Sequence, residues 1–247
     1  MYNQLLIDGD QIAHIVAYRE PTSHKHIEAE VRNYIYRLKS LAHCSFYKLY
    51  VQGKGNFRHD IATLMPYKGN RKKNNGEVVN EIREIMRSSF GAISKDNIET
   101  DDAIGLSQTS TTCICSSDKD LNMIPGWHFN ITNHNTFFVE KEEAIKNFYI
   151  QLITGDKVDN IPGLSERAPL RGIGKKTAEK HLQGITTEVD MFQIVKNLYE
   201  NKYGQQYKYN HWNSKESISC SYIDILNENA QLLWIQQLYK EKWTQPI

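Results

Sequence analysis

The sequence has no excess of charge of either sign and contains little cysteine. Its 247 residues include 30 Lys or Arg and 29 Asp or Glu, which gives a formal net charge of +1. A uniformly basic coat is therefore excluded, and any surface that binds nucleic acid must be local. The four cysteines, Cys44, Cys113, Cys115 and Cys220, have the spacing of neither a zinc site nor a secreted disulfide framework. We therefore expect a reduced, cytoplasmic setting.

Long apolar runs are also absent. The sequence opens with MYNQLLIDGD, which has no basic region, apolar stretch or small-residue cleavage site. We therefore expect neither a signal peptide nor a membrane span. The length fits one large domain or a core with an appendage, and it allows a substantial apolar interior.

Apolar strands alternate with helical stretches, which predicts an α/β core. QLLID (4–8), YKLYVQ (47–52) and TTCICSSD (111–118) are typical of buried strands, and the apolar spacing of 26–44 predicts a crossover helix that includes Leu41. Ligands collect beyond the carboxyl ends of strands in parallel sheets. Asp8 and Asp118 end two of these strands.

A basic segment occupies the middle of the chain. It begins with a turn at Pro66, contains four cations between 68 and 73, and continues as an amphipathic helix from about Val78 to Phe90. A basic run is often only a solvated face. Because Tyr67 adjoins these cations, we favour an interpretation in which the ring stacks on a base or sugar while the cations hold phosphates.

Carboxylates recur in four groups at strand or helix ends: Asp8 with Asp10; Glu99 with Asp101 and Asp102; Asp118 with Asp120; and Asp156 with Asp159. An isolated group is usually a helix cap or a solvated loop, and Thr100 or Asp101 is a candidate cap for the helix that begins at DDAIGL. If the groups converge, hard divalent cations with oxygen ligands, Mg²⁺ or Mn²⁺, would offset their repulsion. Two such ions about 3.5–4 Å apart support phosphodiester hydrolysis.

The order of these segments resembles the phage and bacterial 5′ to 3′ exonucleases and flap endonucleases, and the tail around Glu241 to Pro246 is similar to that of the short exonucleases of podophage type. The matching segments, in collinear order, are LLIDGD (5–10), FR (57–58), YKGNR (67–71), ETDD (99–102), SSDKD (116–120), GDKVDNIPG (155–163) and GIGKKTA (172–178).

The resemblance implies a PIN-like parallel sheet flanked by helices, with a helical arch and a C-terminal helix-two-turn-helix module. It places the nuclease core at 1–153, the arch at about 64–98 within it, and a helical DNA-binding part at 154–247. It also implies a monomer, located in the host cytoplasm if the protein is phage-encoded.

The resemblance also assigns roles to particular residues. Tyr67, Lys68 and Arg71 are expected at the base of the arch, where the two cations grip the scissile phosphate. The expected ligands of two Mg²⁺ or Mn²⁺ ions are Asp8, Glu99, Asp101, Asp102, Asp118 and Asp120, with Asp156 and Asp159 as the second-metal group.

Duplex contacts are expected mainly in the GIGKKTA segment, which in the family holds the duplex backbone, in some members with a K⁺ ion, without reading sequence. The segment is not an ATP-binding loop, because Pro169 stands where the first Gly of that loop belongs and Lys176 replaces its hydroxyl residue. The expected DNA-binding residues are Arg58, Lys72, Lys73, Gly172, Gly174, Lys175, Lys176, Thr177 and Lys180.

The sequence departs from the family at the end of the second strand. Gln52 or Gly53 stands where an Asp is common, and Asp10 replaces a small polar residue. The expected function is metal-dependent hydrolysis of phosphodiesters at 5′ ends, flaps, nicks or RNA primers in duplex DNA or an RNA–DNA hybrid. Two alternatives remain open, namely a structure-specific DNA-binding protein with a weak or silent nuclease centre, and a PIN-type ribonuclease.

Overall fold

A computed structural model describes residues 2–71, 76–165 and 173–246. The chain forms two compact units that are interleaved along the sequence. We call them the sheet unit (Met1–Asn56, Lys73–Lys141 and Ile235–Glu241) and the helical unit (Phe57–Lys72, Glu142–Trp234 and Lys242–Ile247). The functional division after residue 153 stays a prediction.

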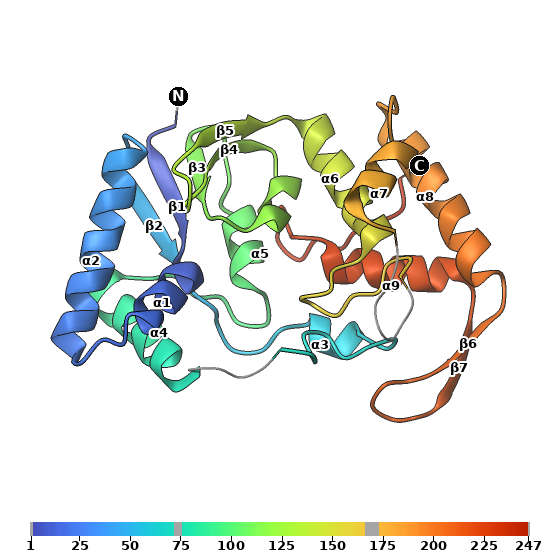
Figure 1. Ribbon diagram of the computed structural model, residues 1–247, viewed down its shortest axis with the longest axis horizontal. Coiled ribbons are helices and arrows are strands. Elements are labelled where there is room, and N and C mark those ends of the chain that lie inside the picture. The colour runs from blue at the N-terminus through green and yellow to red at the C-terminus, as the bar shows by residue number, and fades with distance from the viewer. Residues whose placement is uncertain (1, 72–75, 166–172, 247) are drawn as a thin grey trace. The chain divides into compact units, whose positions relative to one another are not determined.

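A five-stranded sheet forms the centre of the sheet unit (Figure 1). Its strands, in spatial order, are β2 (Phe46–Tyr50), β1 (Gln4–Asp8), β3 (Thr112–Cys115), β4 (Gly126–Phe129) and β5 (Thr136–Val139). Only the β4–β5 pair is antiparallel. The expected α/β fold with a mainly parallel sheet is therefore confirmed. Ile7 pairs with Leu49 and with Cys115, so the carboxyl ends of β1, β2 and β3 lie side by side.

The sheet is buried on both faces. Leu5 and Ile7 belong to the apolar cluster that also contains the buried residues of three helices, α1 (Gly9–Tyr18), α2 (His24–Leu41) and α4 (Gly76–Phe90). Because side chains alternate along a strand, Leu6 points to the opposite face, and it is also fully buried. The sequences of these strands are therefore apolar runs, as expected for a parallel sheet that is covered on both faces.

Helix α2 matches the predicted crossover helix, although its ends differ. Ser23 caps it by accepting a hydrogen bond from the backbone N–H of His26 at 3.3 Å. Ile27, Val31, Ile35 and Leu38 form its buried stripe. Leu41 is the last residue of the helix, as the spacing predicted, but it is 40% exposed and does not extend the buried stripe.

Helix α1 was not among the predicted elements. Its apolar residues Ile12, Ala13, Val16 and Ala17 recur with helical spacing and are buried. Asp8 is the N-cap, and its Oδ1 accepts the backbone N–H groups of Asp10 at 3.1 Å and Gln11 at 3.2 Å. The last residue of β1 therefore also begins a helix.

The helical unit is built around buried aromatic residues. Phe148 packs edge-on against Trp234, with ring centroids 5.1 Å apart, and lies 5.9 Å from Trp243. The hydroxyl of Tyr199 donates to the carbonyl of Leu152 at 2.7 Å. The elements of this unit are α3 (Arg58–Ile61), most of α6 (Lys141–Thr154), α7 (Lys175–His181), α8 (Glu188–Tyr203), α9 (Tyr222–Leu233) and the hairpin of β6 (Tyr207–Asn210) with β7 (Ser217–Cys220).

Across the described residues, none of the helices combines the length and apolar character needed to cross a membrane.

Candidate metal and phosphate site

The carboxyl ends of β1 and β3 bring together Asp8 and the loop that carries Asp118. Asp8 is only 5% exposed. Its Oδ2 accepts the hydroxyl of Ser116 at 3.1 Å, and the same Ser116 oxygen accepts the backbone N–H of Asp118 at 3.0 Å. Ser116 thus joins the two predicted ligand positions. Sequence reasoning did not select it, although its place directly after β3 and two residues before Asp118 is a usable signal.

The charge of Asp8 is poorly compensated. Burial raises the pKa of its carboxyl group to about 7, and the negative charges of Asp10 and, more weakly, Asp118 act in the same direction. The hydrogen bonds from Gln11 and Ser116 favour the charged form but do not cancel these effects. A cation close to Asp8 and Asp118 would favour the ionised carboxylates.

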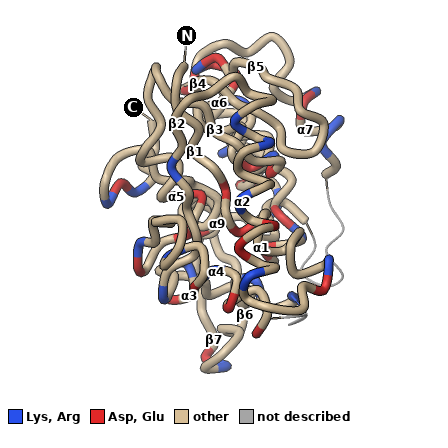
Figure 2. Tube along the Cα trace, turned by 90° about the vertical axis from the view of Figure 1, so that its left-hand side faces the viewer, with Lys and Arg blue, Asp and Glu red and all other residues tan. Residues whose placement is uncertain are grey.

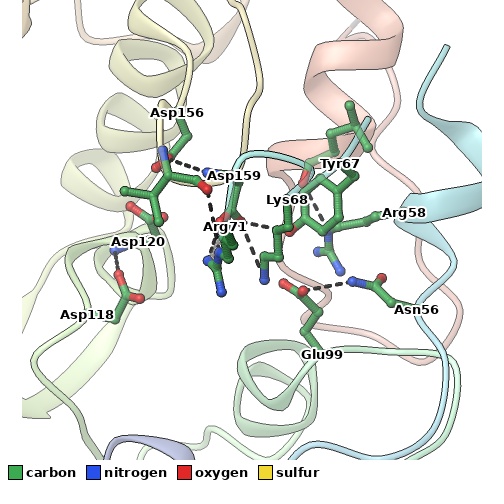
Figure 3. A network of polar contacts seen from close by, with 12 residues as sticks. Asn56, Arg58, Tyr67, Lys68, Arg71, Glu99, Asp118, Asp120, Asp156 and Asp159 are labelled. Atoms are coloured by element: carbon green, nitrogen blue, oxygen red, sulfur yellow. Dashed lines mark hydrogen bonds and ion pairs between the residues drawn. The ribbon is translucent and has the colours of Figure 1, made fainter. Parts of the chain in front are cut away.

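Asp118 is the N-cap of the short 3₁₀ helix η1 (Lys119–Met123), and Asp120 lies in its first turn. The Oδ1 atom of Asp118 accepts the backbone N–H of Asp120 at 2.9 Å (Figure 3). The Asp118 side chain is exposed, and that of Asp120 is 23% exposed. Both carboxylates are therefore accessible to an incoming ligand.

The N-cap of α5 (Thr100–Gly105) is not one of the two residues predicted for it. Glu99, rather than Thr100 or Asp101, is the N-cap residue, because its backbone N–H donates to Oδ2 of Asp102 at 3.0 Å. Oδ1 of Asp102 accepts the backbone N–H of Gln236 at 3.0 Å, and Asp102 is fully buried. These contacts indicate a structural role for Asp102, and its metal role stays a prediction.

Glu99 and Asp101 are half-buried. Oε1 of Glu99 accepts the side-chain amide of Asn56 at 2.7 Å (Figure 3). Asn56 is therefore a further residue of this region that sequence reasoning missed. It adjoins the FR pair at 57–58 but carries no signal of its own.

The donor set suits a hard cation, although it is sparse. Within 2–71, 76–165 and 173–246, no group of three or more His, Cys, Asp or Glu side chains has an arrangement that could hold a metal ion. Mg²⁺ commonly keeps several waters and binds through one or two carboxylates together with phosphate oxygens. Asp8 and Asp118, two carboxylates whose loops are joined through Ser116, fit that chemistry.

Gln52 is one of the two positions, with Gly53, where the resemblance predicts an Asp. Its side-chain amide donates to the carbonyl of Ile98 at 3.1 Å, and its backbone N–H donates to the carboxylate of Asp10 at 3.1 Å. The residue itself brings no negative charge to the end of β2. The carboxylate that contacts Gln52 is that of Asp10.

In the helical unit, the YKGNR segment lies against the DKVDN loop (Figure 3). The carboxylate of Asp159 accepts the hydroxyl of Tyr67 at 2.8 Å and forms ion pairs with Lys68, at 3.5 Å, and with Arg71. The backbone N–H of Lys68 also donates to the carbonyl of Asp159 at 2.8 Å. Two motifs that are distant in sequence are thus one structural feature.

The ring of Tyr67 is not available for stacking on a base. Tyr67 is 4% exposed, and its ring packs edge-on against His59 with a centroid distance of 5.5 Å. The sequence-based interpretation of this ring as a stacking platform is therefore corrected: Tyr67 donates its hydroxyl to Asp159 and supports the two cations that follow it.

Asp156 shapes the DKVDN loop from inside. It is 5% exposed, and its Oδ1 accepts the backbone N–H groups of Val158 at 2.6 Å and Asp159 at 3.0 Å. Its Oδ2 accepts the side-chain amide of Gln151 at 3.3 Å. These bonds satisfy much of the carboxylate, so its predicted place in the second-metal group remains a prediction.

Arg58 requires a correction, because it is 2% exposed rather than on a DNA-facing surface. Its Nε donates to the carbonyl of Leu232 at 2.9 Å, and a terminal nitrogen donates to that of Trp234 at 2.6 Å. These carbonyls lie at the C-terminus of α9, where a cation also complements the helix dipole. In this structure Arg58 is a structural residue.

The cations of the GIGKKTA segment are exposed. Gly174 is the N-cap of α7, and Lys175, Lys176, Thr177 and Lys180 are all exposed on that helix. Lys175 pairs with Glu179 at 3.8 Å. Figure 2 shows basic and acidic positions scattered along the described trace. The predicted residues Lys72, Lys73 and Gly172 lie outside the described residues.

No protein-family model matches the sequence. The fold, however, is shared with solved structures from bacteriophage T5. The T5 D15 protein co-crystallised with metal ions superposes with a TM-score of 0.63 at 16% identity, over 94% of this chain and 89% of that chain. A pseudo-enzyme form of the T5 D15 flap endonuclease, in a product complex with DNA and metal ions, gives 0.61 at 17% identity, over 94% and 88%.

A third structure, the T5 5′-exonuclease with bound zinc, gives a TM-score of 0.61 at 14% identity and covers 94% of this chain and 89% of that chain. The likeness extends over nearly the whole length of both proteins. The α/β architecture inferred from the motifs is therefore the architecture of these nuclease structures.

Proposed function

We propose that the protein is a metal-dependent 5′ nuclease that hydrolyses phosphodiester bonds at 5′ ends, flaps or nicks of duplex nucleic acid and acts as a monomer. One observation carries the proposal: the buried Asp8 carboxylate at the carboxyl end of β1 is joined through Ser116 to the loop of Asp118. This arrangement occurs in a fold shared with T5 structures described as a flap endonuclease and a 5′-exonuclease.

The sheet unit would supply the carboxylates. Asp8 and Asp118 would hold a divalent cation directly, and Asp120, Glu99 and Asp101 would contact it through water molecules. When bound, Mg²⁺ or Mn²⁺ would offset the carboxylate repulsion and polarise a phosphodiester. Three hydrogen bonds hold the Asp8 side chain in this position, and two of them form the N-cap of α1.

The helical unit would supply the cations that hold the substrate. Lys68 and Arg71 would contact phosphate oxygens, and Asp159 with Tyr67 would orient the two side chains beforehand. The exposed Lys175, Lys176 and Lys180 on α7 would contact the duplex backbone without reading its sequence. A K⁺ ion at this turn and the second-metal role of Asp156 and Asp159 are parts of the same proposal.

The test is gel-resolved cleavage of 5′-labelled flap, nicked, blunt and single-stranded DNA and of an RNA-primed duplex, with Mg²⁺, Mn²⁺ or EDTA. We expect metal-dependent cutting near the flap junction or nick that leaves a 5′-phosphate. Asp118→Asn should abolish cutting without unfolding the protein, because the Asn oxygen can still cap η1. Glu142→Gln, which neutralises an exposed carboxylate on α6, should cut at the wild-type rate.

Two results would contradict the proposal. Tight flap binding without cutting in either metal would indicate a structure-specific DNA-binding protein. Cutting of single-stranded RNA with no cutting of any DNA substrate would indicate a ribonuclease. Full activity of Asp118→Asn would leave the activity in place but overturn the assignment of the site.

A further inference from the structure

The carboxylate of Asp10 connects four segments of the sheet unit. Asp10 lies in the first turn of α1, two residues after Asp8. Its two oxygens accept the backbone N–H of Gln52 at 3.1 and 3.3 Å, and Oδ1 accepts Nε of Arg83 at 2.7 Å. Oδ2 also accepts the hydroxyl of Thr100. The donors therefore come from the end of β2, from α4 and from the first residue of α5.

These contacts distinguish Asp10 from Asp8. A carboxylate offers about four lone-pair positions, and the donors to Asp10 occupy most of them. The side chains of Asp10 and Arg83 are 19% and 20% exposed, so their ion pair is largely shielded from water. Arg83 thus compensates the charge of Asp10, whereas the hydrogen bonds that Asp8 accepts come from neutral groups, namely two backbone N–H groups and the hydroxyl of Ser116.

Helix α4 is attached to the Gln52 segment in two ways. Arg83 reaches the Gln52 N–H through Asp10, and Arg87, one turn later on α4, donates to the carbonyl of Gln52 at 2.6 Å. The guanidinium of Arg83 is itself held by Asn80, at 3.0 Å. Both backbone polar groups of Gln52 are therefore fixed by side chains that α4 carries or contacts.

We propose that Asp10 and Arg83 form a positioning pair. The pair fixes the β1 end that carries Asp8, the Gln52 segment and the start of α5 relative to α4. Asp10 acts through Arg83, Gln52 and Thr100 and is not itself a metal ligand. The inference rests on the proposed nuclease function, which it deepens by identifying what holds the Asp8 carboxylate in place.

The test is a double-mutant cycle of Asp10→Asn, Arg83→Gln and the combination. Glu30→Gln serves as the matched control, because it breaks the ion pair of Arg19 with Glu30 on the surface of the same unit. For each variant, kcat and KM are measured on flap DNA, together with the Mg²⁺ concentration that gives half-maximal rate. Amide hydrogen exchange at Gln52 reports on the network without any need for activity.

We expect each single variant to lower kcat by about 10- to 100-fold, because small displacements of reacting groups are costly. KM and the half-maximal Mg²⁺ concentration should stay within about 2-fold of wild type, and the double variant should be no slower than the worse single variant. Exchange at Gln52 should accelerate in both single variants, and the control should match wild type throughout.

Three kinetic results would overturn the proposal. The first is a loss of kcat in the double variant that equals the combined losses of the single variants, and the second is a wild-type kcat in either single variant. The third is a half-maximal Mg²⁺ concentration raised about 10-fold or more by Asp10→Asn but not by Arg83→Gln. The last would make Asp10 a ligand. If the wild-type protein cuts no substrate, the proposed function fails on its own. Amide exchange at Gln52 then still tests whether Asp10 and Arg83 act as a pair, since unchanged exchange in both variants would refute the proposal.

Discussion

Carboxylates of the sheet unit differ in what compensates their charge. Asp10 is paired with Arg83, Asp102 accepts two backbone N–H groups, and Asp8 is buried next to other negative charges. The residue type is the same in each case, and only the surroundings separate a positioning residue, a helix-capping residue and a candidate ligand. Sequence spacing placed these residues in one class because it contains no information on their partners.

Arg58 gives a prediction at the scale of one side chain. Arg58→Met should lower the free energy of unfolding by about 2–4 kcal/mol, because two carbonyls at the end of α9 lose a charged donor in a buried position. The salt dependence of DNA binding should not change. Urea unfolding measures the first effect, and binding titrations at several salt concentrations measure the second.

Arg71→Met is the control for stability, because the Arg71 side chain is 49% exposed and its ion pair is worth less than about 1 kcal/mol. If Arg58→Met instead left stability unchanged and flattened the salt dependence, Arg58 would be a DNA contact after all.

At the scale of elements, local patterns predicted β1, β2 and β3 and helices such as α2 and α4, but they predicted neither helix α1 nor the contacts between loops. Asp8 and Asp118 were predicted together because neighbouring parallel strands end at the same edge. The burial of Arg58 was not predicted, because its partner Leu232 lies 174 positions away and has no recognisable motif. The pairing of Tyr67 with Asp159 spans 92 positions and was equally hidden.

The loop that presents Asp159 depends on two glycines in contact. Gly155 and Gly163 have φ angles of +67° and +55°, and a Cβ on Gly163 would lie 2.3 Å from the backbone nitrogen of Gly155. Gly163→Ala should therefore lower the free energy of unfolding by about 2–5 kcal/mol, through both the left-handed backbone and the clash. Chemical denaturation measures this loss.

Gly184→Ala separates the effect of the left-handed backbone from that of the clash at Gly163. Gly184 has a φ of +77°, but a Cβ there would meet no atom within 4 Å. Its substitution should cost only the backbone strain, about 1–2 kcal/mol. Equal losses at both positions would mean that the close packing of Gly155 and Gly163 contributes nothing.

At the scale of the whole molecule, a net charge of +1 leaves little general attraction for DNA. The salt dependence of binding should then reflect a few local cations. Lys175→Ala combined with Lys176→Ala should reduce the slope of log K against log salt concentration by about 2, since each lost phosphate contact removes about 0.9. Fluorescence anisotropy with a labelled duplex measures the slope.

The matched control is Lys25→Ala combined with Lys141→Ala, two exposed lysines outside α7. Both double variants remove two positive charges, so each changes the net charge from +1 to −1. If the two slopes fell equally, net charge rather than α7 would govern binding.

The interleaving of the two units affects how the protein matures on the ribosome. Residues Ile235–Glu241 belong to the sheet unit, and the backbone N–H of Gln236 holds the buried Asp102 beside the acidic start of α5. Domains that are continuous in sequence can fold one after another during synthesis. Here the first unit to emerge must wait for nearly the entire chain before its last contacts form. A nascent chain would therefore carry its candidate metal-binding carboxylates without the completed framework around them.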